Sequence, residues 1–222
     1  VVGAQWGDEG KGKIVDYYAS QADLVIRYCG GANAGHTIVL GEKKYKLQHI
    51  PSGIFYPGKT NIMGNGTVVD PKKLLEELEM LKGAGVKPNL VISPRAHVVM
   101  PYHFVLDGAE EAKKGGLAAG TTKRGIGPCY ADKAARFGIR ISELLSPEMF
   151  REKLHTMHLL ESRIIEGVYG LTFSRTEDEI FNEYSAYAKQ IAPFVKDTTE
   201  IIGEALSKKK KILLEGAQAT ML

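Results

Sequence analysis

The feature that most constrains this chain is a glycine-rich stretch near its beginning, residues 3–16. It reads GAQWGDEGKGKIVD, which predicts the end of a buried strand, a loop and the start of a helix. Gly7 and the pair Gly12-Lys13 have the spacing of a phosphate-binding loop. The glycines let backbone N–H groups turn toward an anion at a helix N-terminus, and the lysine adds a point charge. The stretch therefore predicts a phosphate site.

The residue after this lysine departs from the usual phosphate loop. A serine or threonine normally follows, and its hydroxyl holds Mg²⁺, but here the residue is Ile14. Any Mg²⁺ needs another ligand, and Asp8 within the loop is the obvious candidate. A carboxylate there repels phosphate unless a cation lies between them or a substrate needs a base, so we expect Asp8 to be functional. The alternative, an ordinary strand-to-helix turn, is less favoured because lysines and acids alternate with the glycines.

Composition and charge limit the classes of protein to which this sequence can belong. The 222 residues are 44% hydrophobic, as in a globular protein with a sizeable core. The formal net charge of +3 suits anionic small molecules but is too small to indicate nucleic-acid binding. No signal peptide or membrane-spanning run is seen, and Cys29 and Cys129 lack metal spacing, so we expect a cytoplasmic protein. The short first strand and the end after an apolar run indicate a fragment.

The order of apolar and glycine-rich segments predicts an α/β fold with a mainly parallel sheet and flanking helices. We expect one domain over residues 1–222, with a helical subregion at about 101–210. Residues 115–128 are glycine-rich and basic, which predicts a long loop that carries function. The expected strands are 24–28, 90–92 and 212–214, with a hairpin over 38–48, and the expected helices are 12–20, 71–83, 101–114, 147–167, 177–195 and 197–210.

A second glycine-rich turn, residues 30–37, follows the strand expected at 24–28 and carries Asn33, Gly35 and His36. In a parallel sheet this turn and the first loop open onto the same edge, where ligands bind. His36 could act there as a general acid, because its unperturbed pKa lies near neutrality. A structural or solvated histidine is the alternative that the sequence leaves open.

Several other polar positions carry weaker signals. Residues 121–124 offer hydroxyls and cations that suit a monophosphate, although a surface loop with solvated charges is an open alternative. Gln218 follows a strand, and its amide could read a purine edge. His155 and His158 have helical spacing but no third ligand, which favours packing over metal binding. The lysines at 208–211 are expected to form a solvated helix end.

Five blocks in this order resemble the adenylosuccinate synthetase family, whose members join IMP and L-aspartate with GTP in purine nucleotide synthesis. They span essentially the whole chain, which resembles the N-terminal half or so of a family member. The resemblance implies a P-loop-like nucleotide-binding architecture with a helical insertion, GTP as co-substrate, one Mg²⁺ per active site and a homodimer. The blocks are residues 5–13, 33–37, 120–128, 132–136 and 215–218.

The resemblance also implies a mechanism. Asp8 is similar to the base that removes the N1 proton of IMP, so that the 6-oxygen can attack the γ-phosphate of GTP. His36 is similar to the general acid of this transfer, and the amine of aspartate then displaces phosphate from 6-phosphoryl-IMP. Mg²⁺ would be held by Asp8 and the backbone carbonyl of Gly35. Arg136 resembles the arginine that reaches IMP across the dimer interface.

The remaining contacts implied by the resemblance lie on the same loops. No block corresponds to the parts that read guanine and bind aspartate, so we expect the fragment alone to be inactive. The implied GTP contacts are Gly7, Asp8, Glu9, Gly10, Lys11, Gly12, Lys13, Gly35, His36 and Thr37. The implied IMP contacts are Asp8, Glu9, Gly10, Lys11, Asn33, Ala34, Gly35, His36, Thr122, Arg136 and Gln218.

Three other functions were weighed against this one. A GTPase switch needs serine or threonine after Lys13 and two downstream guanine and magnesium motifs, none of which is present. A related ligase that uses ATP or another purine monophosphate would keep the same loops, although Asp8 favours an inosine-type substrate with a proton to lose. A nucleic-acid module is disfavoured because no basic face with interleaved aromatic residues occurs. No membrane partner is expected either.

Overall fold

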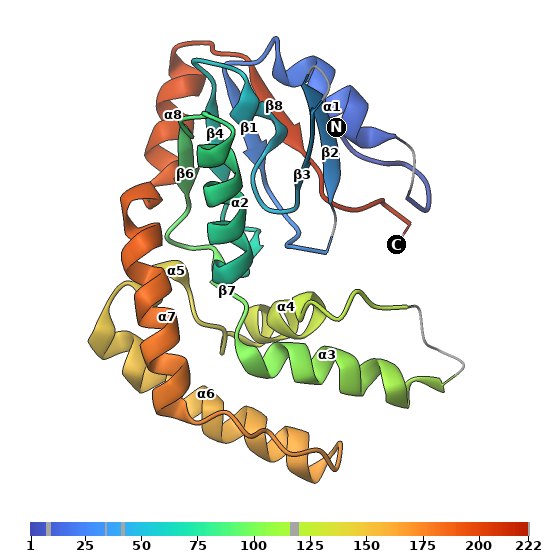
Figure 1. Ribbon diagram of the computed structural model, residues 1–222, viewed down its shortest axis with the longest axis vertical. Coiled ribbons are helices and arrows are strands. Elements are labelled where there is room, and N and C mark those ends of the chain that lie inside the picture. The colour runs from blue at the N-terminus through green and yellow to red at the C-terminus, as the bar shows by residue number, and fades with distance from the viewer. Residues whose placement is uncertain (8–9, 34, 41–42, 116–119, 222) are drawn as a thin grey trace.

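The centre of the molecule is a four-stranded parallel sheet with the strand order β6-β4-β1-β8 (Figure 1). The computed structural model describes residues 1–7, 10–33, 35–40, 43–115 and 120–221. The sheet confirms the α/β class that the sequence predicts. Its strands are β1 (Leu24–Arg27), β4 (Thr60–Met63), β6 (Leu90–Ile92) and β8 (Ile212–Glu215).

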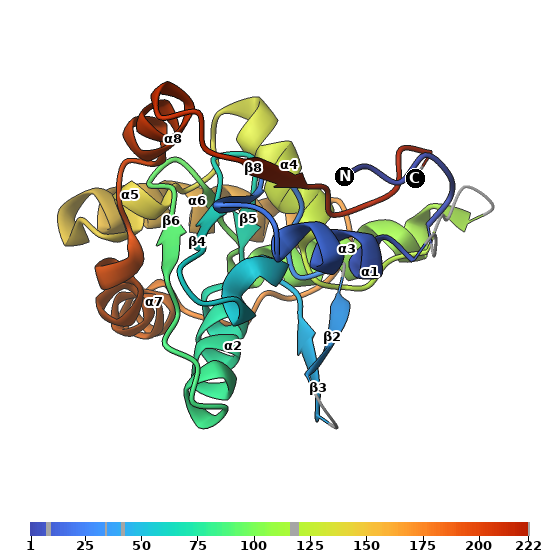
Figure 2. The same cartoon turned by 90° about the horizontal axis from the view of Figure 1, so that it is seen from above.

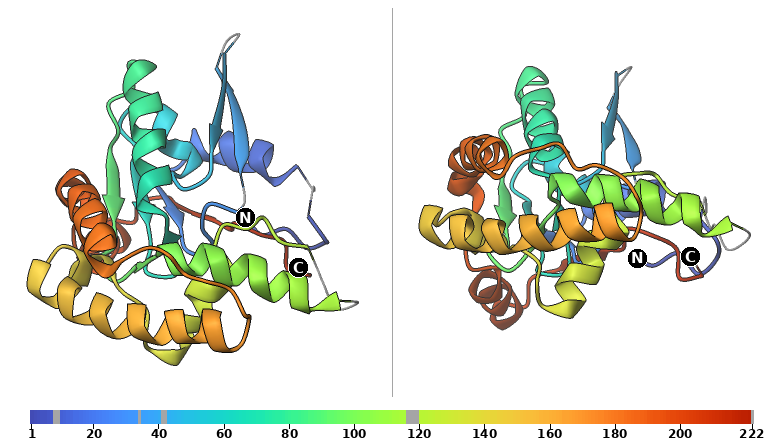
Figure 3. Two further views of the ribbon diagram at one scale, coloured as in Figure 1. Left: turned by 60° about the horizontal axis from the view of Figure 1, so that its bottom comes forward. Right: turned by 90° about the horizontal axis from the view of Figure 1, so that it is seen from below.

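The other elements flank the sheet or form a helical layer next to it (Figures 1 and 3). Helix α2 and the antiparallel hairpin of β2 and β3 project on the same side of the sheet (Figure 2). Two short strands, β5 and β7, pair in parallel between the sheet and the helical layer. The bounds are α1 (Lys11–Ala19), β2 (His36–Leu40), β3 (Lys43–Leu47), β5 (Val68–Val69), α2 (Pro71–Gly83), β7 (His97–Val98), α3 (Pro101–Lys113), α4 (Ile126–Ala135), α5 (Ile141–Leu144), α6 (Pro147–Gly167), α7 (Glu177–Ile191) and α8 (Thr198–Ser207), with 3₁₀ turns at Ser52–Phe55 and Ala192–Phe194.

Helix α2 begins where the sequence predicts, and its cap explains why. The Asp70 side chain accepts a hydrogen bond from the Lys73 N–H (3.1 Å), and Pro71 occupies the first helical position, where no N–H is needed. Leu74 and Leu81 are fully buried on one face of the helix. Local sequence and core packing therefore favour the same helix.

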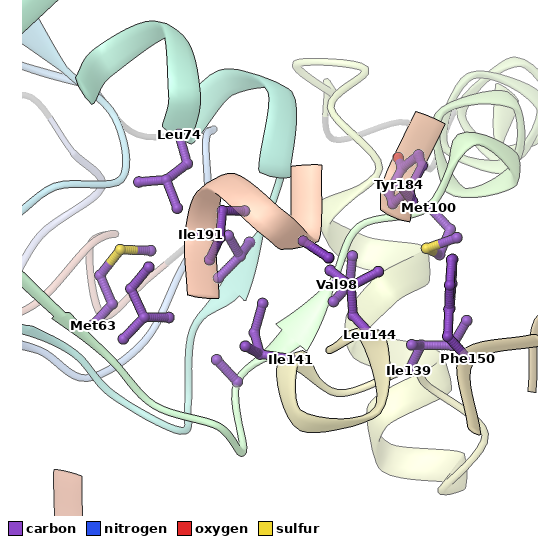
Figure 4. Packing of buried hydrophobic residues seen from close by; sticks show 14 of the residues in the cluster. Met63, Leu74, Val98, Met100, Ile139, Ile141, Leu144, Phe150, Tyr184 and Ile191 are labelled. Carbon is purple, nitrogen blue, oxygen red and sulfur yellow. The ribbon is translucent and has the colours of Figure 1, made fainter. Parts of the chain in front are cut away.

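The largest hydrophobic core joins the sheet to the helical layer (Figure 4). Met63 at the end of β4 and Leu74 on α2 lie near Ile191 at the end of α7, and Ile141 of α5 lies beneath them. Further from the sheet, Phe150 of α6 belongs to the same cluster. Because one core spans both layers, the helical residues pack against β4 and β6, and β4 in turn pairs with β1.

One prediction of local structure was wrong, and one strand was not predicted. The expected loop over 115–128 ends early, because α4 begins at Ile126 and places Pro128 in its first turn, where a missing N–H costs nothing. The central strand β4 was not predicted, since its four residues include the polar Asn61, which is buried. Both elements depend on packing partners that are distant in sequence.

The two ends of the described chain lie side by side (Figures 1 and 2). The Val1 ammonium donates to the Leu214 carbonyl, and the Gly216 N–H donates to the Val1 carbonyl (3.1 Å). The Thr220 N–H then donates to the Gly3 carbonyl (2.8 Å). This pairing holds the first glycine-rich loop beside the segment that follows β8.

Candidate functional site

A cleft of about 920 Å³ opens at the carboxyl ends of β1 and β8, and segments distant in sequence line it. This is the sheet edge at which a parallel α/β fold is expected to bind ligands. The structure brings most of the predicted site residues together in this cleft. Those that line it are Gly7, Gly10, Lys11, Gly12, Lys13, Asn33, Gly35, Thr37, Thr122 and Gln218.

The glycine-rich loop meets the cleft through the N-terminus of α1. Gly7 and Gly10 have φ values of 105° and 73°, in the region that glycine adopts without a steric penalty. Gly10 is the N-cap of α1, and the helix begins with Lys11, followed by Lys13 in the same turn. The positive end of the helix and two lysines therefore face one cleft, an arrangement that favours a bound phosphate.

The second glycine-rich turn is fixed from below by Arg27, the last residue of β1. Its guanidinium is buried and donates hydrogen bonds to the carbonyl of Gly31 (2.9 Å) and to that of Gln48. The Gln48 amide in turn donates to the Ala32 carbonyl (2.8 Å). The backbone immediately before Asn33 is therefore held by two side-chain hydrogen bonds at the floor of the cleft, and the third links Arg27 to the residue that makes one of them.

Two buried carboxylates accompany this arginine. Glu215 ends β8, directly beside Arg27 in the strand register, and accepts hydrogen bonds from the N–H and hydroxyl of Ser52 (3.0 and 3.1 Å). Glu77 accepts the N–H groups of residues 48–50. Burial lowers the pKa of Arg27, and the negative charges of Glu215 and Glu77 oppose that shift. The three charges thus hold the turn after β1 and the segment 48–52 together beneath the cleft.

Sequence reasoning missed Arg27 and Glu215, although a signal was present. Each is a charged residue at the end of a short apolar strand, LVIR and ILLE. A charge in that position lies at the carboxyl edge of a parallel sheet and is buried once loops cover it. Arg27 was expected only as part of the strand 24–28, and Glu215 only as the first residue of the block 215–218 that follows the strand 212–214.

Gly30 shows how closely the loops approach one another. Its φ is +83°, and a Cβ added there would lie 2.2 Å from the Cβ of Ala217, far inside a normal contact. Its N–H donates to the hydroxyl of Tyr130 (2.7 Å), which itself donates to the Gly66 carbonyl (2.6 Å). Gly30 therefore joins the turn before Asn33 to the segment before Gln218.

Some predicted residues are not described or lie elsewhere. Asp8, Glu9 and Ala34 lie outside the described residues, and so does the side chain of His36, whose backbone opens β2. Arg136 is the C-cap of α4 with a left-handed φ of 67°, is exposed, and does not line the cleft. Its predicted contact with IMP lies across a dimer interface and stays a prediction.

A buried polar cluster lies behind the helical wall of the cleft. His103 Nδ1 accepts the Met100 N–H (2.9 Å), so its Nε2 carries the proton and donates to Asp132 (2.9 Å). Burial lowers the pKa of His103, which keeps the imidazole neutral. Burial, together with the charge of Asp132 and a hydrogen bond to it, raises the pKa of Glu161 to about 7. This cluster joins α3, α4 and α6.

The remaining histidine and lysine patterns have structural explanations. His155 bonds to Glu177 (2.9 Å) and His158 to the Arg175 carbonyl (2.7 Å), and no group of metal-binding side chains occurs among the described residues. Lys208 is the C-cap of α8 and pairs with Glu204 (2.8 Å), as expected for a solvated helix end.

Two further sequence expectations can be compared with the described residues. Both cysteines are free; Cys129 is buried, whereas Cys29 is partly exposed. Within the described ranges, no helix has the length and apolar character needed to cross a membrane.

Comparison with known proteins gives the family. A family model described as adenylosuccinate synthetase matches residues 1–222. The chain belongs to the adenylosuccinate synthetase family. The adenylosuccinate synthetases of Clostridium acetobutylicum and Bacillus cereus are 53% and 55% identical to it over 225 and 223 residues. These matches cover 100% of the chain and 52% of each relative, so the chain spans about half the length of the adenylosuccinate synthetases it matches.

Solved structures agree with this assignment. The fully ligated adenylosuccinate synthetase from Plasmodium falciparum superposes with a TM-score of 0.88 at 38% identity, over 100% of this chain and 51% of that one. A cyanophage S-2L succinoaminodeoxyadenylate synthetase, bound to dGMP and dATP as an energy donor, gives a TM-score of 0.60 at 21% identity, over 98% of this chain and 50% of that one. The second likeness shows a shared fold only.

Proposed function

We propose that the protein to which this sequence belongs is a GTP-dependent ligase that forms adenylosuccinate from IMP and L-aspartate, with release of GDP and phosphate. The observation that carries the proposal is the single cleft that unites the phosphate loop with Asn33, Thr122 and Gln218. The membership of the adenylosuccinate synthetase family supports it. A cleft with a phosphate loop on one side and amide and hydroxyl groups on the other suits two nucleotides held face to face.

In the proposed mechanism, Asp8 removes the N1 proton of IMP, and the 6-oxygen attacks the γ-phosphorus of GTP. GDP leaves as the bond between the β–γ bridging oxygen and the γ-phosphorus breaks, and His36 stabilises the charge that develops on the phosphate oxygens. The amine of aspartate then attacks C6, and phosphate departs with the former 6-oxygen. Lys13 and the N-terminus of α1 would hold the triphosphate, and Asn33, Thr122 and Gln218 would hold IMP.

Asp8 and the backbone carbonyl of Gly35 are the proposed protein ligands of Mg²⁺. Gly7 and Gly10, on either side of Asp8 and Glu9, line the cleft together with Gly35, and hard oxygen donors of these two kinds suit Mg²⁺. When bound, Mg²⁺ would neutralise charge on the phosphate oxygens. The protein's own contribution is the cationic loop, which draws the triphosphate into the cleft and orients it.

We also propose a homodimer in which Arg136 reaches the IMP site of the partner subunit. Its exposed position at the end of α4, outside the cleft of its own chain, supports this role. The two free cysteines support a reducing compartment, and we propose that the protein acts in the cytoplasm.

The test is an activity assay on the full-length gene product. IMP, L-aspartate, GTP and Mg²⁺ are mixed, and adenylosuccinate is followed by its ultraviolet absorbance and identified by mass. Parallel arms replace GTP with ATP, or IMP with dGMP, and a further arm omits Mg²⁺. Product with GTP and IMP, lost without Mg²⁺, supports the proposal. Turnover with ATP but not GTP, or with dGMP but not IMP, would instead favour a related ligase with the same fold.

A further inference from the structure

The turn that carries Thr122 is held by one side chain from a different helix. Asp107 lies on α3 and accepts a hydrogen bond from the Thr121 hydroxyl at Oδ1 (2.6 Å). Its other oxygen, Oδ2, accepts the N–H of Gly125 (2.8 Å). A single carboxylate therefore binds the turn on both sides of residues 122–124. Asp107 itself lines the cleft.

The hydroxyl of Thr121 also makes a hydrogen bond within the turn. It donates to Asp107 and accepts the N–H of Lys123 (3.1 Å), so the backbone closes around Thr122. Lys123 has a left-handed φ of 53°, which is unfavourable for a residue with a side chain and needs support from neighbouring contacts. Thr122 lies between Thr121 and Lys123, and it lines the cleft.

The far end of the turn is fixed by close packing. Gly125 has a φ of +70° and is the N-cap of α4. A Cβ there would lie 2.8 Å from the Cβ of His103 and 2.9 Å from its carbonyl carbon, so the backbone rests directly on α3. Glu111, one helical turn after Asp107, accepts the Gly120 N–H (2.6 Å) before the turn begins. Contacts with one face of α3 thus fix the conformation of the turn.

The carboxylate of Asp107 is unexpected in a cleft that is proposed to bind phosphate. An anion there opposes phosphate binding, so its presence must be offset by what it stabilises. Both oxygens of Asp107 accept hydrogen bonds from the turn, and charge-assisted bonds of this kind are stronger than neutral ones. The gain in order of the turn explains why a negative charge is tolerated at this position.

We infer that Asp107 is a positioning residue for the nucleoside monophosphate site, acting through Thr121 and Gly125 to present Thr122 to the ligand. The inference rests on the proposed function, because it assigns the substrate as the monophosphate. Loss of Asp107 should weaken binding of the monophosphate much more than binding of the triphosphate, whose proposed loop is a separate segment at the start of α1. Asp107 makes no proton transfer in this role.

The experiment measures the KM for IMP, the KM for GTP and kcat for four variants of the full-length gene product. Asp107→Ala loses both bonds and should raise the KM for IMP about tenfold to a hundredfold, with the KM for GTP changed less than about threefold. Asp107→Asn keeps the geometry, because its amide oxygen can accept from Gly125 while its NH₂ donates to the Thr121 hydroxyl. It should restore the KM to within about threefold of wild type. Thr121→Val should fall between the two, and Thr121→Ser should match wild type.

A second measurement does not depend on the substrate. Trypsin can cleave after Lys123 and Arg124, and intact-mass analysis follows the rate at those bonds. Asp107→Ala should accelerate this cleavage and Asp107→Asn should not. Glu110→Gln, which neutralises a carboxyl on the same helix and cleft wall without touching either bond, should leave the cleavage rate at the wild-type value.

Each result decides between the inference and its rivals. Equal increases in both KM values, or an Asp107→Asn variant as impaired as Asp107→Ala, would overturn the positioning role. Unchanged cleavage in Asp107→Ala would overturn the hold on the turn. If the wild type makes no product from IMP in any arm, the proposed function fails, and the cleavage rates alone then decide whether Asp107 fixes the turn.

Discussion

The close approach of Gly30 to Ala217 allows a quantitative test of how the cleft is built. Gly30→Ala places a side chain at φ +83°, which costs about 1–2 kcal/mol, reduced by the lower entropy of the unfolded chain. The new Cβ would also lie 2.2 Å from the Cβ of Ala217, and overpacking of this kind costs about 1–3 kcal/mol more. We expect a total loss of about 2–4 kcal/mol in the free energy of unfolding.

A matched control separates the two contributions. Gly58 has a similar φ of +78°, is exposed, and would have nothing within 4 Å of an added Cβ. Gly58→Ala should therefore cost only about 1 kcal/mol, from backbone strain alone. The double variant of Gly30→Ala with Ala217→Gly removes the clash but keeps the strain. Relative to Ala217→Gly alone, it should lose the same amount as Gly58→Ala.

The assay is urea unfolding of the full-length gene product, with the KM for IMP measured on the same samples. Gly30→Ala should also raise that KM, because Gln218 directly follows the displaced residue, whereas Gly58→Ala should leave it unchanged. A coupling energy between positions 30 and 217 below about 0.5 kcal/mol would refute the reasoning. So would a Gly30→Ala variant that is no less stable than Gly58→Ala.

Three further predictions concern charges. Asp8→Asn should abolish turnover but leave GTP binding largely intact, as progress curves and equilibrium dialysis would show, because the base is lost while the cationic loop that holds the triphosphate remains. The contribution of Glu161 to the stability should fall by about 1–2 kcal/mol between pH 4.5 and about 7, since folding raises its pKa from 4.5 to about 7 and the folded state therefore loses the proton last. Glu161→Gln should remove this slope in urea unfolding curves. Arg27→Met should lower the free energy of unfolding by about 3–5 kcal/mol, because it leaves Glu215 without its neighbouring cation. The double variant Arg27→Met with Glu215→Gln should recover part of that loss in the same assay.

Each of these predictions has a contrary result. Near-normal turnover in Asp8→Asn would exclude it as the base. A stability difference between the wild type and Glu161→Gln that does not change over that pH range would contradict the raised pKa. A loss below about 1 kcal/mol in Arg27→Met would mean that the buried charges do not hold the loops together.

Local sequence signals predicted many elements well. The Asp70-Pro71 start of α2 was readable because a cap and a proline act within one turn. The strands β1, β6 and β8 were readable as apolar runs. β4 was missed because Asn61 interrupts its pattern, and only its position between β1 and β6 makes a buried amide possible there. The early start of α4 was missed because Gly125 depends on contact with α3.

Some residues of the candidate site could likewise be predicted from local sequence, and others could not. Gly7, Lys13 and the turn around Asn33 were predicted, because loops after strands have characteristic glycine spacing. The roles of Asp8 and His36 stay predictions. Asp107 was not singled out, since nothing near it in sequence marks an aspartate in the middle of a helix as a contact of a later turn.

The phosphate loop, the strands that precede the ligand turns and the blocks that give the family could be read from the sequence, because each depends on residues within a few positions of one another. Only the tertiary structure decided what the cleft rests on. Ser52 and Glu215 are 163 residues apart along the chain and share a hydrogen bond, because β8 pairs directly beside β1. Strand order is set by packing of the whole core, and it alone places Glu215 against Arg27.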